Sequence, residues 1–256
     1  MFLLFLLIPL LASTIGSIVG AGGGVIIKPV LDMLGVMPVK TLSFCSGCAV
    51  LSMSVASLIR GRNDDVKLDL KASTSLATGA VFGGIIGKDL LELTANAFEN
   101  ESMLGAMQSI LLAVTMVNVI IYICIKSKVR SMNIKSALVS VVIGLLLGAI
   151  SSYVGPLNVA VLLFFFGMDA KTAAKNSIFI IVFSQLASIF MSLFTHTVPE
   201  FSWFYLILMS VGGILGAMLG NWISKRIDNR AVEFLLKLLT LFVAIISVIN
   251  AINYLN

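Results

Sequence analysis

The stretch GSIVGAGGGVIIKPVLDMLG, residues 16–35, places a cluster of glycines and a lysine inside an otherwise apolar segment. The surrounding region, residues 2–35, is too long for one straight membrane helix, which needs about 20 apolar residues. Irregular backbone at membrane depth is tolerated only where protein buries it or water reaches it. The stretch therefore predicts a helix that is interrupted at GAGGG, residues 20–24, and followed by a short second helix.

The composition of the whole chain is that of an integral membrane protein. Hydrophobic residues make up 59% and charged residues 11%, against about 45–50% and roughly 25% in soluble domains. The net charge of +5 lies in loops between apolar runs. Charges in such loops indicate the orientation of the protein in the membrane, and not nucleic-acid binding. Uninterrupted runs long enough to span lie at about 41–60, 72–91, 102–125, 172–195, 202–223 and 231–253. We expect an all-α polytopic helix bundle, one membrane domain over residues 1–256 with about eight hydrophobic segments.

A second interrupted region, residues 136–167, corresponds to the first. Its break is SSYVGP, residues 151–156, and at a shift of 132 Gly16 aligns with Gly148 and Gly23 with Gly155. Further along, GAVFGGIIG (79–87) aligns with GGILGAMLG (212–220). Both read G-x-x-x-G-x-x-x-G, a spacing that lets helix backbones approach closely. The matching order predicts a duplication with repeats 1–128 and 129–256, and such halves with interrupted helices are typical of transporters.

The basic residues indicate the expected topology, because cytoplasmic loops collect Lys and Arg. If both interrupted regions cross the membrane, these residues divide almost evenly between its two sides. If both regions re-enter, one side holds only Lys40 and Lys88. The other side then collects Arg60, Arg62, Lys67, Lys71, Lys126, Lys128, Arg130, Lys135, Lys171, Lys175, Lys225, Arg226 and Arg230. This bias favours re-entrant hairpins, inverted halves, and a multi-pass plasma-membrane protein with both termini outside the cytoplasm.

The two breaks predict a small anion site. A break exposes backbone N–H groups at the start of the next short helix, where the helix dipole also favours an anion. Glycines let the backbone itself approach a ligand. The expected substrate-binding residues are Gly22, Gly23, Gly24, Lys28, Ser43, Ser46, Ser151, Ser152, Gly155, Asn158, Asn176 and Ser177. The alternative is structural, with glycines serving close packing and the polar residues after each short helix capping the next one.

Lys28 is the clearest single candidate for a functional residue, because placing an ionisable side chain within a membrane segment costs free energy. It is either an anion ligand or a structural partner of Asp32 at i+4, unless it extends to the membrane interface. Cys45 and Cys48 form a C-x-x-C on a predicted membrane helix and are interpreted as small packing residues. No catalytic set, metal cluster or phosphate-binding loop is evident, so neither an enzyme nor a cofactor is expected.

Three stretches together resemble the TauE/SafE, or TSUP, family of sulfite exporters. They are GSIVGAGGGVIIKPVLDMLG, RGRNDDVKLDLKASTSLATGAVFGGIIG and KTAAKNSIFIIVFSQLASI, in the family's order along nearly the whole chain. The second break departs from the family pattern in lacking a glycine triplet, and Lys28 departs from the first motif. The resemblance implies transport of sulfite, thiosulfate, sulfonates or related organic acids. The residues of this chain that match the family's two motifs, and that the resemblance therefore implies for the site, are Gly20, Gly22, Gly23, Gly24, Pro29, Gly148, Gly155 and Pro156.

The sequence thus predicts a secondary transporter that moves a small anion across the lipid bilayer by alternating access at the two breaks. One alternative is a membrane scaffold or assembly protein that binds partners through its glycine zippers. A passive anion channel is another. The zippers fit packing within one chain or between two, so a homodimer is compatible with the sequence.

Overall fold

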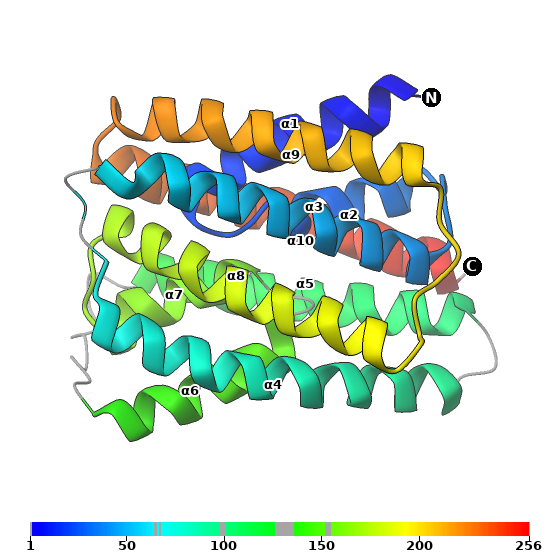
Figure 1. Ribbon diagram of the computed structural model, residues 1–256. Helices are drawn as coiled ribbons and strands as arrows, with labels where there is room; N and C mark the ends of the chain where they lie inside the picture. The colour runs from blue at the N-terminus through cyan, green and yellow to red at the C-terminus, as the bar shows by residue number, and fades with distance from the viewer. Residues whose placement is uncertain are drawn as a thin grey trace.

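The computed structural model describes residues 2–63, 66, 68–97, 101–125, 136–151 and 155–255. Within these ranges the ordered elements are α-helices and one short 3-10 helix at Gly61–Asn63 (Figure 1). The helices are α1 (Phe2–Val19), α2 (Gly24–Met33), α3 (Val39–Arg60), α4 (Leu70–Ala97), α5 (Glu101–Ile125), α6 (Ala137–Ser151), α7 (Gly155–Phe165), α8 (Ala170–Phe194), α9 (Trp203–Ser224) and α10 (Asn229–Leu255).

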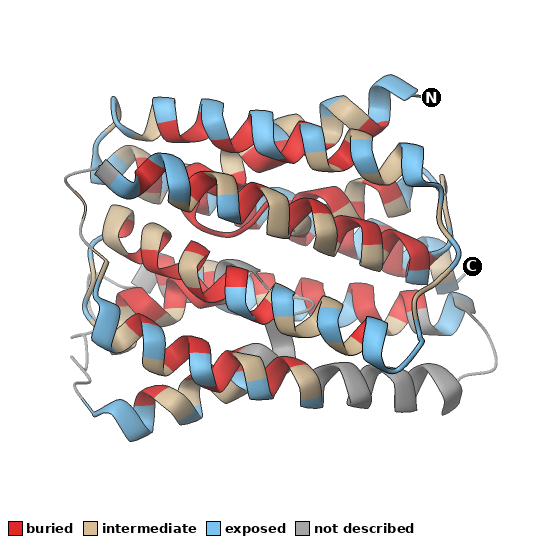
Figure 2. Ribbon diagram, viewed as in Figure 1, coloured by how far each residue is buried: buried red, intermediate tan, exposed pale blue. Residues whose placement is uncertain are grey.

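The predicted polytopic helix bundle is confirmed. The uninterrupted runs are α3, α4, α5, α8, α9 and α10, and the interrupted regions are the pairs α1–α2 and α6–α7. Five helices in the described part, α1, α3, α8, α9 and α10, are long and apolar enough to cross a membrane. Large apolar side chains such as Phe190, Phe194 and Trp203 remain exposed, as expected of a lipid-facing surface. Buried residues line the inward faces of the helices (Figure 2).

The first interrupted pair is a hairpin whose two outer ends lie at the same end of the bundle. Phe2, at the start of α1, packs edge-on against Phe204 at the start of α9, with ring centroids 5.4 Å apart. Asp32, near the end of α2, accepts a 2.5 Å hydrogen bond from the Tyr254 hydroxyl near the end of α10. Both chain termini lie at this end, which we call the terminal end (Figure 1).

The opposite end, which we call the basic end, is where α3 ends and α4, α8 and α10 begin. There the Lys175 Nζ donates to the carbonyl oxygens of Gly61 and Val66, each at 2.6 Å. The Lys171 backbone N–H donates to Asn229 Oδ1 at 3.0 Å. The pair α6–α7 begins and ends at the basic end (Figure 1). Each interrupted pair therefore leaves the bundle at the end where it entered; its position in a membrane stays a prediction.

The glycine zippers pack helices within the chain. A Cβ on Gly212, Gly216 or Gly220 of α9 would lie within 2.6 Å of atoms of α1. A Cβ on Gly79 of α4 would lie 2.0 Å from the Val141 carbonyl oxygen of α6. The zipper helix of each predicted half therefore packs against the opening helix of the other half, at a separation that a larger residue would prevent.

Several other helix contacts follow the same exchange between the two halves. When α1–α5 are exchanged for α6–α10, the contacts α3–α9 and α2–α10 become α8–α4 and α7–α5, and all four are present. The contacts α3–α8 and α5–α10 map onto themselves. This correspondence supports the predicted repeats 1–128 and 129–256, which remain a prediction.

Candidate functional site

The first break is a tight reversal of the chain that glycine makes sterically possible. Gly20 and Gly22 have φ angles of +76° and +75°, a left-handed conformation that side chains disfavour. A Cβ on Gly20 would lie 2.2 Å from the Ala174 Cα, so α8 also requires glycine there. The Ser177 hydroxyl donates to the Gly20 carbonyl oxygen at 2.6 Å and fixes the turn. Packing therefore accounts for Gly20, as the structural alternative expected.

Both short helices begin near the middle of the bundle. α2 has 10 residues and ends at the terminal end, and α7 has 11 residues and ends at the basic end. At 1.5 Å per residue each is about 16 Å long, roughly half of a hydrocarbon core about 30 Å thick. A Cβ on Gly24 would lie 2.7 Å from Val50 Cγ2, midway along α3. The two short helices also contact each other, so the positive ends of two helix dipoles lie near the middle of the bundle.

Polar atoms without a protein partner occur at both helix starts. Asn158, in the first turns of α7, is 1% exposed, and neither its Oδ1 nor its Nδ2 has a hydrogen-bond partner in the described structure. Ser13 is fully buried, and its unpartnered Oγ lies 2.7 Å from where a Cβ on Gly23 would stand. Burying such groups unpaired costs about 1–3 kcal/mol each. These atoms are therefore placed to bind a polar ligand or water.

Unpartnered polar atoms also occur on α3 and α10. The hydroxyls of Ser43 and Ser54 on α3 are buried without a partner among the described residues. Asn250 on α10 donates from Nδ2 to the Pro29 carbonyl oxygen at 2.9 Å, while its Oδ1 is unpartnered. Ser43 belongs to the set predicted from the sequence. Ser13, Ser54 and Asn250 were missed, because isolated polar residues in apolar helices are too common to single out.

Other predicted site residues hold the fold together. Asn176 accepts hydrogen bonds from the Asp69 N–H at 3.1 Å and from the Ser73 hydroxyl, which ties α8 to the start of α4. The Ser46 hydroxyl donates to the Ser43 carbonyl oxygen at 3.0 Å within α3. Of the second break, only the backbones of Ser151, Gly155 and Pro156 are described, and Ser152 lies outside the described residues.

Lys28 lies in a polar cluster between α2, α5 and α10, which comprises Lys28, Asp32, Gln108, Asn250 and Tyr254. The Lys28 Nζ donates to Gln108 Oε1 at 2.6 Å. Asp32, one turn further along α2, attracts the same ammonium group and accepts the Tyr254 hydrogen bond. These contacts favour the structural alternative for Lys28, in which it anchors the short helix α2 to the long helices around it.

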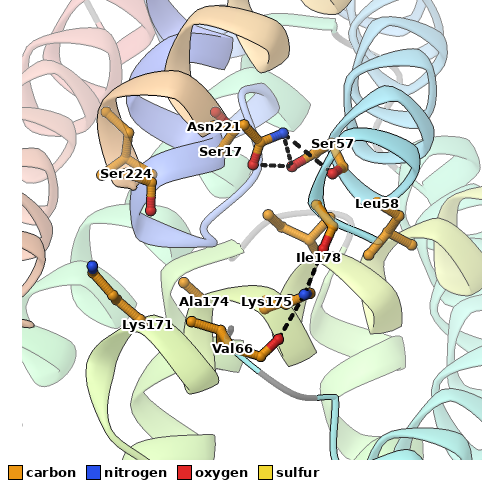
Figure 3. Close-up of a pocket in the computed structure, with 12 residues that line it drawn as sticks. Ser17, Ser57, Leu58, Val66, Lys171, Ala174, Lys175, Ile178, Asn221 and Ser224 are labelled. Carbon is orange, nitrogen blue, oxygen red and sulfur yellow. Dashed lines mark hydrogen bonds between the residues drawn. The ribbon is translucent and has the colours of Figure 1, made fainter. Parts of the chain in front are cut away.

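A pocket of about 40 Å³ opens at the basic end (Figure 3). It lies among the last turns of α1, α3 and α9 and the first turns of α8. Its polar lining consists of Ser17, Ser57, Asn221, Ser224, Lys171 and Lys175. None of these residues was among the predicted site residues. No group of His, Cys, Asp and Glu able to hold a metal ion was found among the described residues.

A bundle of helices long and apolar enough to span a membrane, with two interrupted pairs and unpartnered polar groups where the short helices begin, has the architecture of a membrane transporter. The chain belongs to the TauE/SafE family: the family model described as "Sulfite exporter TauE/SafE" matches residues 5–247. The chain is 20% identical over 273 residues to the "Probable membrane transporter protein YunE" of Bacillus subtilis (strain 168), covering 94% of this chain and 95% of that protein. No solved structure matches. The family resemblance seen in the sequence is thereby confirmed.

Proposed function

We propose that this chain is a secondary transporter of a small sulfur-containing anion, which binds where α2 and α7 begin. The observation that carries the proposal is the pair of buried, unpartnered side chains at those starts, Ser13 beside Gly23 and Asn158 in α7. A hydroxyl and an amide N–H both donate hydrogen bonds, and oxyanion oxygens accept them.

Electrostatics supports an anion over a cation at this position. Each helix start carries roughly half a positive elementary charge, and backbone N–H groups at such a start point at the ligand. The sulfur chemistry comes from the family. It places sulfite, thiosulfate, sulfonates or related organic acids ahead of other small anions as the substrate class.

Two observations favour a transporter over the alternatives. Helix α1 of the same chain packs directly against the zipper glycines Gly212, Gly216 and Gly220. That face of α9 is therefore not available to the partner of a scaffold protein. Ser13 and Asn158 are closed to solvent, at 0% and 1% exposure. A passive channel needs a continuous path past its site, whereas an occluded site is what alternating access requires.

The proposed orientation follows from the charges at the two ends. Most of the described basic residues lie at or near the basic end, namely Arg60, Arg62, Lys71, Lys171, Lys175, Lys225, Arg226 and Arg230, whereas Lys40 lies in the first turn of α3 at the terminal end. The positive-inside rule therefore puts this end in the cytoplasm, with both termini outside the plasma membrane. Transport requires no cofactor in this scheme.

The test is thermal unfolding of the purified protein with sulfite, sulfate, thiosulfate, small sulfonates, acetate or chloride. An anion at 100 times its dissociation constant should add about 2.7 kcal/mol if it binds only the folded state. We expect stabilisation by at least one sulfur oxyanion, and none by acetate or chloride at equal ionic strength. Equal stabilisation by all of these anions, or by none, would overturn the proposed site.

A further inference from the structure

The pocket at the basic end lies directly beside the first break. Ser17 and Ile18, which line it, precede Gly20 by one turn or less. Ala174, which also lines it, is the residue that a Cβ on Gly20 would strike. Because the same short segments form the pocket and the turn, an anion in the pocket would be one helical turn from the reversal that leads to α2.

The inner wall of the pocket carries a hydrogen-bonded polar pair, Ser57 and Asn221. Asn221 donates from Nδ2 to the Ser57 carbonyl oxygen at 3.2 Å, and its Oδ1 accepts from the Ser57 hydroxyl at 3.3 Å. Both residues are buried, and together they join α3 to α9. Ser17 lies next to them on α1 (Figure 3). Hydroxyl and amide groups held in this way form a preorganised surface for a polar ligand.

Two lysines give the pocket a positive charge. Lys175 is fixed on one side by its hydrogen bonds to the carbonyl oxygens of Gly61 and Val66. Lys171, one turn earlier on α8, lies on the side nearer Ser224 (Figure 3). None of the described residues that line the pocket is acidic. Partly buried positive charges with no lining carboxylate attract an anion.

The size of the pocket selects a small anion. One enclosed water requires at least about 10–15 Å³ of such volume, so 40 Å³ holds about three waters or one oxyanion with few heavy atoms. A nucleotide or a long-chain organic acid would not fit without rearrangement of the helices.

We propose that this pocket is a second, entry-side binding site for the transported oxyanion, in which Lys171 supplies the attracting charge. The inference rests on the proposed transport function. It adds a site at the basic end that lies apart from the unpartnered groups at mid-depth. An anion would occupy this pocket before entering, or after leaving, the central site.

The test compares uptake of radiolabelled sulfite by right-side-out and inverted membrane vesicles. Lys171→Gln should raise the half-saturating sulfite concentration about tenfold in the vesicles that expose the basic end, and leave it nearly unchanged in the others. Lys171→Arg should retain most of the affinity, because it keeps the charge. Lys71→Gln removes an exposed charge at the same end outside the pocket and should behave as wild type.

A second variant, Ser224→Met, fills the pocket from α9 without removing a charge and should lower uptake from the basic end. Unchanged uptake by Lys171→Gln in both vesicle types would overturn the entry site and leave the transport proposal standing. An equal loss in both types would also overturn it, since an entry site acts from one side only. Absence of sulfite uptake by the wild-type protein in both types would instead contradict sulfite transport itself.

Discussion

Asn158 presents the clearest energetic anomaly at the scale of single residues. Its amide is buried without any hydrogen-bond partner in the described structure, although a buried polar group is normally paired. An Asn at this position weakens the ligand-free fold unless a ligand or water satisfies it. Selection for binding accounts for such a residue more simply than selection for stability does.

The change Asn158→Leu tests this interpretation, because leucine has a similar size and no polar atoms. We expect it to raise the unfolding free energy of the ligand-free protein by about 1–3 kcal/mol and to abolish the stabilisation by sulfur oxyanions. Thermal unfolding with and without the anion measures both effects. Asn118→Leu is the matched control, since the Asn118 amide is exposed and bonds to its own helix at Val114. Full anion stabilisation in Asn158→Leu would remove Asn158 from the site.

The partly buried cation Lys28 leads to a different prediction. If it is a structural partner of Asp32 and Gln108, Lys28→Met should destabilise the protein by about 3 kcal/mol, because the Asp32 carboxylate loses its neighbouring positive charge and keeps, among the described residues, only the Tyr254 hydroxyl. The double change Lys28→Met with Asp32→Asn should recover most of that loss and keep the anion-induced stabilisation. If the double variant is stable but no anion stabilises it further, Lys28 binds the anion and is not a structural partner.

At the scale of elements, the helix interruption is built from backbone conformation and close contact together. Gly20 combines a positive φ with a backbone neighbour that leaves no room for a Cβ. Gly35 also has a positive φ, +59°, but a Cβ there would meet nothing within 4 Å. The two positions therefore separate conformational strain from steric exclusion.

Substitution by alanine measures this difference. Gly35→Ala should cost about 1–2 kcal/mol, the price of the left-handed conformation alone. Gly20→Ala should cost clearly more, because α8 or the turn must also move. Denaturation of the two purified variants in parallel gives the comparison. Equal costs would mean that the turn relaxes freely away from Ala174, and that tight packing does not hold the break in place.

At the scale of the whole molecule, the hairpin arrangement fixes which loops share a side of the membrane. Trp203 and Trp222 stand near the two ends of α9, about 29 Å apart along the axis at 1.5 Å per residue. That separation matches a bilayer core of about 30 Å with aromatic residues at both interfaces. The helix ends, and hence the loops between them, should therefore lie at the two membrane surfaces.

Cysteine labelling tests the sidedness. In a background without the native cysteines, Leu34→Cys and Glu200→Cys should react in intact cells with a reagent that cannot cross membranes. Asp228→Cys should react only after the membrane is opened. If the interrupted regions crossed the membrane, Leu34 and Glu200 would lie on opposite sides. Labelling of only one of these two positions in intact cells would therefore refute the hairpin topology.

The sequence by itself determined the elements of this protein and their order. A helix in lipid must satisfy its own backbone hydrogen bonds, so the length of each apolar run and the position of each glycine break fix where helices begin and end. That is a local requirement, readable from residues 16–35 and 136–167 without knowledge of their neighbours. It also revealed Asn158 and Ser43 as polar residues near the breaks.

Only the tertiary structure decided which polar atoms are paired. Ser177 and Asn176 look like Ser43 and Asn158 in the sequence, yet they bond to Gly20 and Asp69 across the bundle, whereas Ser43 and Asn158 keep unpartnered atoms. The same holds for the basic-end pocket, whose walls combine residues of α1, α3, α8 and α9, from Ser17 to Ser224 along the chain. Hydrogen-bond satisfaction and cavity shape depend on partners brought together by packing, and no local pattern in the chain specifies them.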